Sequence, residues 1–286
     1  MAACTAALRG ITKQYKDFTL GPVDMTVPAG SIVGLIGENG AGKTTLLKIL
    51  CGVNRADDGT VDLLGSSPAD AATRAKIGVV FEDAFFYGSF TAAQVARSLA
   101  GMYDARWNAD NFSAYLRRFG LDAGKKLKEY SRGMRLKLSL AAALAHGPEL
   151  LVLDEATAGL DPVVRGELLD LFLEFIQDER HSIVMSSHIT ADLEQIADSI
   201  AYLHNGQLLF QENKDDLLQE YGVLHCGEDV LTSLPAGLVV FTRRGAYGCE
   251  SLVRERRTVQ DLLPEAVCDA ARLDDIMRFY SGRDAQ

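Results

Sequence analysis

A glycine-rich segment near the N-terminus holds residue types that bind phosphate groups. Residues 37–44 read Gly-Glu-Asn-Gly-Ala-Gly-Lys-Thr and fit the pattern G-x-x-x-x-G-K-[ST] without a mismatch. Glycines let successive backbone N–H groups converge on phosphate oxygens, the lysine adds a fixed positive charge, and the threonine hydroxyl is a ligand for Mg²⁺. The sequence therefore predicts a nucleoside triphosphate site made of Gly37, Glu38, Asn39, Gly40, Ala41, Gly42, Lys43, Thr44 and Thr45.

A second segment brings two carboxylates to the end of an apolar run. Residues 150–155 read Leu-Leu-Val-Leu-Asp-Glu. A buried strand that ends in carboxylates needs a reason, because an unpaired buried carboxylate is costly. Beside a bound triphosphate, Asp154 can hold Mg²⁺ and Glu155 can orient or deprotonate the attacking water.

The residues around both segments predict the elements that position them. Residues 31–36 form an apolar run typical of a buried strand, and residues 45–51 have a helical pattern whose N-terminus would point its dipole at a bound anion. Further strand patterns occur at residues 18–20, 23–27, 59–63, 77–81, 150–153 and 182–186. Helical patterns occur at 91–120, with Thr91 as the expected N-cap, and at 134–146, 163–176 and 189–197. This alternation predicts a mainly parallel sheet with an inserted helical block at about residues 83–146.

The pattern changes after residue 221. A short alternating run at residues 238–241 and a helical stretch at 273–280 predict a small α+β domain over residues 222–286, leaving residues 1–221 as the nucleotide-binding domain.

Composition narrows the class of protein. The net charge of −10 argues against nucleic acid as a partner. The five cysteines are scattered without metal-type spacing, which fits a reducing cytosol. No apolar run approaches the roughly 18 residues needed to cross a bilayer. Any role at a membrane is therefore expected to depend on a partner.

Three further motifs lie between and after these segments. Residues 130–134 read Tyr-Ser-Arg-Gly-Met, residues 158–162 read Ala-Gly-Leu-Asp-Pro, and residues 185–188 read Met-Ser-Ser-His. In this order, with the phosphate loop and the Asp-Glu pair, residues 5–220 resemble an ABC-type ATPase. The residues around the first motif are similar to single-domain ATP-binding subunits of bacterial export systems, including antibiotic-resistance types.

The resemblance implies an α/β fold and a set of roles. The expected fold has a P-loop NTPase core sheet, an N-terminal antiparallel β layer, the inserted helical subdomain and the small C-terminal domain. Tyr15 would stack on adenine, with Phe18 as the alternative. His188 would contact the γ-phosphate, Lys43 would neutralise charge on it, and Glu155 would act as general base. The remaining roles fall to the signature residues Ser131, Arg132, Gly133 and Met134, which would contact ATP of a second subunit, and to Asp161, which would bridge the two subunits.

Three positions depart from the family pattern. Glu82 stands where the family usually has a glutamine that ligates the metal, so the metal ligands would be Thr44, Asp154 and Glu82. Arg132 replaces a glycine, and Ala156 stands where proline is common. Just after Glu82, the aromatic residues Phe85, Phe86 and Tyr87 suit a groove for a membrane partner, with core packing as the alternative.

The sequence thus predicts an ATP-binding and ATP-hydrolysing subunit that powers a membrane transporter. It would work with Mg²⁺, a transmembrane permease and a second ATP-binding subunit, either an identical chain or a paralogue. The chain would be cytoplasmic and peripheral to the inner face of the membrane. The open alternatives are a soluble ABC-type ATPase in assembly or repair, and a weakly hydrolysing nucleotide sensor.

Overall fold

The computed structural model describes residues 4–81, 86–235, 237–245 and 248–281. Its N-terminal part is a three-stranded antiparallel sheet in the order β2-β1-β4. Alternate residues of β2 are buried, as expected for a strand with one face on the core. The three strands are β1 (Cys4–Gln14), β2 (Thr19–Pro28) and β4 (Asp58–Leu63).

A six-stranded sheet forms the centre of the molecule, in the order β5-β6-β7-β3-β8-β9. Neighbouring strands from β5 to β8 run parallel, and β9 pairs antiparallel with β8 at the edge. Every residue of β3, β6 and β7 is buried, since both faces of the sheet are covered. The strands are β3 (Ile32–Ile36), β5 (Ile77–Val80), β6 (Leu150–Asp154), β7 (Ser182–Ser186), β8 (Ser199–His204) and β9 (Gln207–Asn213).

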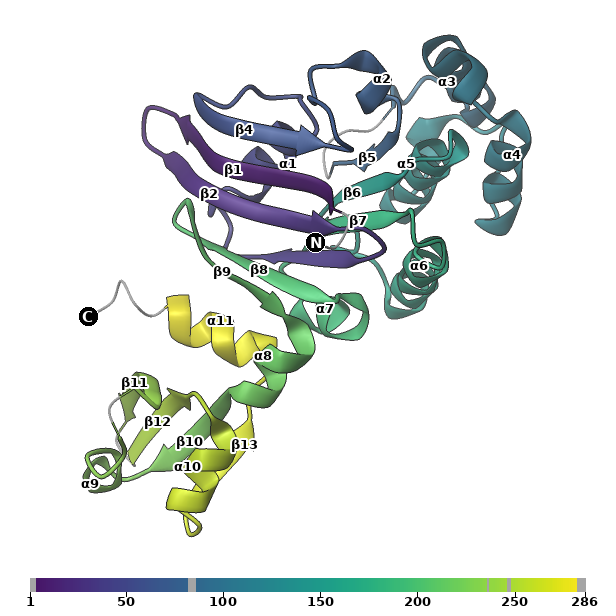
Figure 1. Cartoon of the computed structure of the whole chain (residues 1–286). Coiled ribbons are helices and arrows are strands. Elements are labelled where there is room, and N and C mark those ends of the chain that lie inside the picture. Colours follow the sequence, from purple (N-terminus) through teal and green to yellow (C-terminus); the bar gives the residue numbers. More distant parts are fainter. Residues whose placement is uncertain (1–3, 82–85, 236, 246–247, 282–286) are drawn as a thin grey trace.

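Each face of the central sheet has its own hydrophobic core (Figure 1). On one face, the antiparallel sheet covers α1 (Lys43–Leu50), whose Leu46 and Leu47 are fully buried. On the other face lie α5 (Arg132–Ala145), α6 (Pro162–Phe175) and α7 (Thr190–Ile196). Gln211 on β9 joins the two sheets, because its amide bonds both the backbone N–H and the carbonyl of Thr26 on β2 (3.0 and 2.6 Å).

A helical block follows β5 and the short α2 (Ala71–Arg74). The single helical stretch expected at residues 91–120 is wrong in this respect, because the chain breaks into α3 (Ala92–Tyr103) and α4 (Ala109–Arg118). Asp104, with φ of 46°, ends α3, and the turn η1 (Asp104–Arg106) separates the helices. The expected N-cap Thr91 is confirmed, with a reciprocal capping box to Gln94. A second turn, η2 (Leu127–Glu129), precedes α5.

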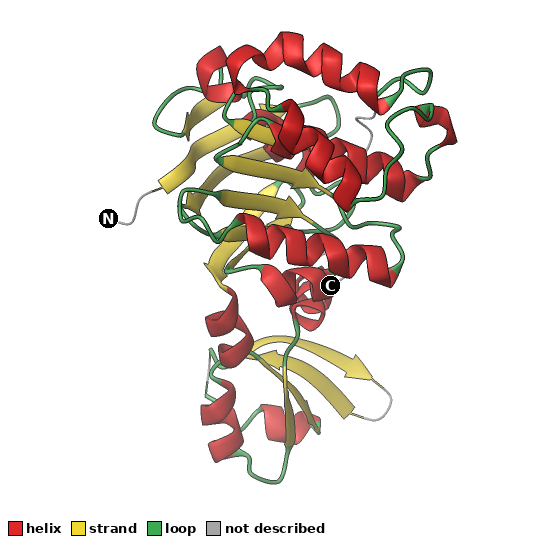
Figure 2. Ribbon diagram, turned by 90° about the vertical axis from the view of Figure 1, so that its right-hand side faces the viewer, coloured by secondary structure: helices red, strands yellow, loops and turns green. Residues whose placement is uncertain are grey.

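The C-terminal part is a second antiparallel sheet that hangs below the larger body (Figures 1 and 2). It follows α8 (Lys214–Glu220), which leads out of β9. The order of elements is βαββαβ and the sheet order is β11-β12-β10-β13, which is the ferredoxin-like arrangement. Its elements are β10 (Gly222–Cys226), α9 (Glu228–Leu231), β11 (Val239–Gly245), β12 (Gly248–Val253), α10 (Arg256–Leu262) and β13 (Val267–Ala270).

The last helix, α11 (Leu273–Ser281), connects the two parts. Its buried residues Leu273, Ile276 and Phe279 belong to the same core as α7 and the central sheet. The small sheet therefore packs α9 and α10 against one face and α11 against the other.

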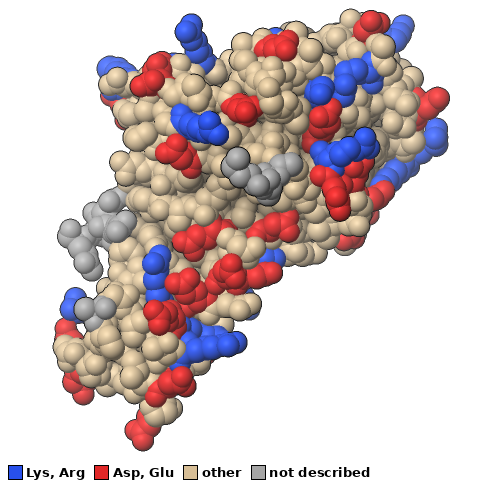
Figure 3. Space-filling model, viewed as in Figure 1, with Lys and Arg blue, Asp and Glu red and all other residues tan. Residues whose placement is uncertain are grey.

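The surface near this junction is acidic. Figure 3 shows carboxylates gathered over α8, where Asp215, Asp216 and Glu220 follow Glu212 of β9. Burial, together with the charges of Glu220 and Asp216, raises the pKa of Glu212 against the opposing effect of Arg254.

Among the described residues, no helix is both long and apolar enough to cross a membrane.

Candidate nucleotide-binding site

The glycine-rich segment forms the turn between β3 and α1. Gly42 caps the helix in a left-handed conformation (φ 106°), which favours glycine. A Cβ atom on Gly37 would lie 2.2 Å from the carbonyl oxygen of Leu203 on β8, so this position admits no side chain. The loop is thus held close to the sheet, and the free N–H groups at the start of α1 face outward as an anion site.

Lys43 is the first residue of α1 and is only 6% exposed. Its ammonium group donates to the backbone oxygens of Gly37 (2.8 Å) and Glu38 (3.2 Å), and lies 3.5 Å from Oε1 of Glu155. A buried cation held by its own loop can neutralise phosphate charge with little reorganisation.

Asp154 lies at the end of β6, beside this loop, and is buried. Its carboxylate accepts hydrogen bonds from the hydroxyls of Thr44 (2.8 Å) and Ser186 (2.6 Å). Hydroxyl and carboxylate oxygens are the ligands that Mg²⁺ takes beside phosphate groups, so Thr44 and Asp154 fit that ion. The sequence prediction gave no role to Ser186. This residue ends β7, which is the parallel neighbour of β6. Because parallel strands end at the same edge of a sheet, its position beside Asp154 could have been expected.

Glu155 and His188 form a close pair at the same edge. Oε2 of Glu155 lies 2.6 Å from Nδ1 of His188 and accepts a hydrogen bond from the His188 backbone N–H (3.3 Å). Glu155 has φ of 52°, an uncommon conformation for a non-glycine residue that clusters at functional sites. The Glu155 side chain is 11% exposed and that of His188 53%, so the pair faces solvent through the histidine.

Lys43, Thr44 and Glu155 line one cavity of about 240 Å³. Phe18 forms part of its wall, whereas Tyr15 is 42% exposed with its ring centroid 6.4 Å from that of Phe18. Of the two residues expected to stack on adenine, Phe18 therefore lies nearer the phosphate loop than Tyr15. The residues that line the cavity are Phe18, Glu38, Asn39, Gly40, Gly42, Lys43, Thr44, Thr45 and Glu155. The arrangement combines an anion-binding loop, a cation, residues that fit a metal ion and a carboxylate base. These are the groups that phosphoryl transfer to water requires.

Cys51 is a buried residue that caps the C-terminal end of α1, the helix that follows the phosphate loop. Burial raises the pKa of its thiol to about 12, with the charge of Asp154 adding to the effect. The thiol is therefore a neutral packing group beneath the site.

The signature residues lie at the start of α5, outside this cavity. Ser131 caps the helix through a hydrogen bond from the Met134 N–H (3.2 Å). Arg132 lies against Gly159, because a Cβ added to Gly159 would be 3.6 Å from the guanidinium carbon of Arg132. Gly133 lies near Leu160 in the same way, since a Cβ added to Gly133 would be 3.4 Å from the Leu160 side chain. Asp161 caps α6 through the Val164 N–H (3.0 Å). None of residues 131–134 lines the cavity of Lys43.

The remaining predicted residues lie at the entrance to the helical block. Glu82 and Phe85 are outside the described residues. Phe86 is half-buried in the core of that block, and Tyr87 is 77% exposed with its ring 5.8 Å from that of Phe90.

Comparison with known proteins identifies the family. The family model described as ABC transporter matches residues 20–158. The chain is 35% identical over 212 residues to the bacitracin transport ATP-binding protein BcrA of Enterococcus faecalis, covering 72% of this chain and 68% of that protein. It is 32% identical over 214 residues to the lantibiotic transport ATP-binding protein SrtF of Streptococcus pyogenes, covering 73% and 90%. The chain belongs to the ABC transporter ATP-binding proteins.

Members of this family are ATPases, so the nucleotide expected at the site is ATP. A solved ATP-binding subunit of an ABC transporter matches 74% of this ABC protein and 91% of its own chain, with 27% identity and a TM-score of 0.66. The ATP-binding cassette MJ0796, bound to ADP and phosphate, shares the fold at 23% identity and a TM-score of 0.66, covering 73% of this chain and 98% of that one. The predicted fold class and family are thus confirmed.

The match covers only part of some relatives. An ABC transporter ATP-binding protein of Synechocystis is 37% identical over 206 residues, which is 70% of this chain but 58% of that protein.

Proposed function

We propose that this chain is the ATP-hydrolysing subunit of a membrane ABC transporter that exports its substrate. The observation that carries the proposal is the convergence of two pairs at one edge of the sheet. Thr44 is hydrogen-bonded to Asp154 (2.8 Å), and Lys43 lies 3.5 Å from Glu155. The names of the two relatives, which refer to bacitracin and lantibiotic transport, support a role in transport.

The proposed reaction is in-line attack of water on the γ-phosphate. Glu155 accepts the proton of that water or orients it, and His188 holds the carboxylate through Nδ1. Lys43 moves its interactions from the carbonyls of Gly37 and Glu38 to phosphate oxygens. Mg²⁺, when bound to Thr44 and Asp154, would neutralise charge that develops on the phosphates. Glu82 is proposed as a further ligand of this ion.

The proposed working unit is a dimer of ATP-binding subunits attached to a permease. Ser131 to Met134 lie outside the chain's own phosphate cavity, which supports their contact with ATP on a second subunit, identical or paralogous. Asp161 would meet that subunit beside them. Tyr87, with Phe85 and Phe86, would bind the transmembrane partner, which would hold the chain at the inner face of the membrane.

The test is the oligomeric state of Glu155→Gln, measured by size-exclusion chromatography with light scattering. ATP should bind to this variant but not turn over, so the mass should double with Mg-ATP and remain that of a monomer without it. The control Lys43→Ala/Glu155→Gln, which lacks the phosphate-binding cation, should stay monomeric. If Glu155→Gln alone stays monomeric at saturating Mg-ATP, a homodimer is ruled out, and a paralogous partner or a nucleotide sensor is favoured.

A second measurement separates transport from soluble roles. The chain should sediment with membranes from cells that contain it and should leave them when the permease is absent. Recovery entirely in the supernatant would favour an assembly or repair ATPase.

A further inference from the structure

Two of the five cysteines face each other across neighbouring strands of the C-terminal sheet. Cys226, the last residue of β10, lies directly opposite Cys249 of β12 in the antiparallel register. Directly opposed residues project from the same face, with Cα atoms about 4.5–5.5 Å apart. A disulfide needs Cα atoms about 4.4–6.8 Å apart. The two thiols are therefore placed for a covalent bond without movement of the backbone.

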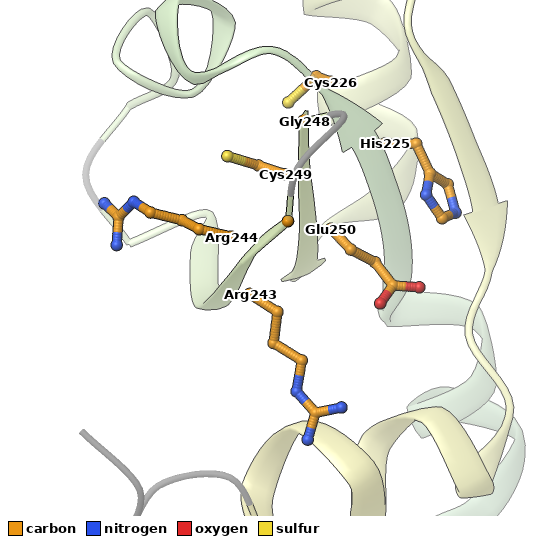
Figure 4. A pocket seen from close by; sticks show the side chains of 8 residues that line it. His225, Cys226, Arg243, Arg244, Gly248, Cys249 and Glu250 are labelled. Atoms are coloured by element: carbon orange, nitrogen blue, oxygen red, sulfur yellow. The ribbon is translucent and has the colours of Figure 1, made fainter.

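Figure 4 shows this arrangement directly. The sulfur atoms of Cys226 and Cys249 point to one side of the strands, and the side chain of His225 points to the other. This is the alternation expected in a strand, because Cys226 and His225 are consecutive residues.

The other three cysteines have no such partner in the part of the chain that the structure describes. Cys268 lies in the same sheet, opposite Leu224, but its sulfur is directed at Gly222, where an added Cβ would lie 2.9 Å from it. Cys4 is exposed on β1, and Cys51 is buried below the phosphate loop. The other three cysteines therefore serve as internal controls for any reaction of the opposed pair Cys226 and Cys249.

The two thiols differ in access. Cys226 is half-buried and lines two neighbouring cavities of about 510 and 570 Å³, whereas Cys249 is 7% exposed and lines only the first. A small reagent that enters either cavity reaches Cys226 first. Arg244 of β11 is opposite Cys249 in the sheet, and its guanidinium group pairs with Glu228 at 2.8 Å.

We propose that Cys226 and Cys249 are a modification site that forms a reversible disulfide by exchange with a low-molecular-weight disulfide. In the first step, the Cys226 thiolate attacks one sulfur of the small disulfide, breaks its S–S bond and releases one thiolate. In the second step, the Cys249 thiolate attacks the Cys226 sulfur of the mixed disulfide and releases the second thiolate. The two protons of the cysteine thiols pass to the released thiolates, and the two electrons lost by the protein reduce the small disulfide.

The bond would link two elements of the C-terminal part at a defined place. Cys226 precedes Gly227 and α9, so the disulfide ties the entry of that helix to the central strand β12. Because Cys226 belongs to the walls of both cavities, its oxidation state would alter the lining of both cavities together.

The experiment uses the full chain and oxidised glutathione. After incubation, remaining thiols are blocked with a maleimide and the protein is digested with trypsin without reduction. Each cysteine falls in its own tryptic peptide: residues 1–9, 49–55, 215–243, 245–254 and 258–272. We expect a linked species of peptides 215–243 and 245–254, the other three peptides carrying maleimide, and full reversal by a dithiol reductant.

Two variants serve as controls. Cys268→Ser should leave the link intact, because that thiol is directed at Gly222. Cys226→Ser should abolish it and leave at most a glutathione adduct on Cys249. The proposal is overturned if peptides 215–243 and 245–254 remain unlinked in the folded wild-type chain, whether as free thiols or as separate glutathione adducts, or if either is linked to 258–272.

Discussion

Glu194 on α7 accepts a hydrogen bond of 2.8 Å from the backbone N–H of Leu273, the first residue of α11. The backbone oxygen of Glu194 accepts a second bond, from the ammonium group of Lys214 on α8 (2.8 Å). The helix that follows His188 is therefore bonded to two elements that lead into and out of the C-terminal sheet. The C-terminal part and the catalytic edge share α7 as a common support.

Glu194→Ala is expected to lower the free energy of unfolding by about 1–2 kcal/mol, because it leaves an N–H at the start of α11 without its charged acceptor. Urea denaturation followed by circular dichroism measures the change. Glu194→Gln keeps an acceptor oxygen and should lose less than half as much. Equal losses in the two variants would show that packing, not the hydrogen bond, sets the effect.

Lys43→Ala is expected to reduce ATP hydrolysis by at least about 100-fold, since it removes the preorganised cation of the phosphate loop. Steady-state phosphate release measures the rate. The matched control is Lys48→Ala on the same helix, whose ammonium group lies 5.5 Å from the centre of the Phe81 ring, and which should keep nearly full activity. A similar rate loss in both variants would indicate damage to α1 instead.

Two glycines of the loop should differ in their response to alanine. A Cβ on Gly37 meets the Leu203 carbonyl at 2.2 Å, so Gly37→Ala should destabilise the protein by about 3 kcal/mol. Gly40 has φ of 83° with no atom within 4 Å of its Cβ position, so Gly40→Ala should cost only the left-handed strain of about 1–2 kcal/mol. Thermal unfolding of both variants checks the order, and the reverse order would refute it.

The buried thiol of Cys51 predicts a pH effect at the alkaline end. Its pKa rises from an ordinary value of 9.0 to about 12 in the folded chain, so above pH 9 the unfolded state releases the proton that the folded state retains. The stabilising contribution is complete below pH 9 and is lost as the pH rises towards 12, by up to about 1.4 kcal/mol per pH unit.

Comparison of variants isolates this effect from other titrating groups. Between pH 8 and pH 10.5, Cys51→Ala should lose less stability than the wild-type chain, as measured by urea unfolding. Cys4→Ala, which removes an exposed thiol, should follow the wild type. Parallel curves for Cys51→Ala and the wild type would contradict the assignment.

The sequence was informative where the determinants are local. Thr91 was expected to cap a helix and does, because a cap acts over three residues. The phosphate loop and the Asp154–Glu155 pair follow from contiguous patterns. Their meeting needed only the rule that parallel strands end at one edge.

The elements that escaped prediction depend on distant partners. β13 has only four residues, and its register with β10 joins positions more than 40 residues apart. β9 has no clean alternation because most of its residues are half-buried. The pairing of Cys226 with Cys249 depends on another non-local register, that of β10 with β12, so no spacing in the sequence indicates it.

Because α11 packs against the larger body, it limits where this chain can be truncated. Tyr280 packs edge-on against Tyr202 of β8, with ring centroids 5.7 Å apart, and its hydroxyl lies 3.4 Å from that of Tyr221. A chain cut after residue 221 would leave the apolar surfaces of α7 and Tyr202 open to water and favour aggregation. The ATPase body is therefore completed by α11, and a fragment without this helix would be a poor substitute for it in any assay of turnover.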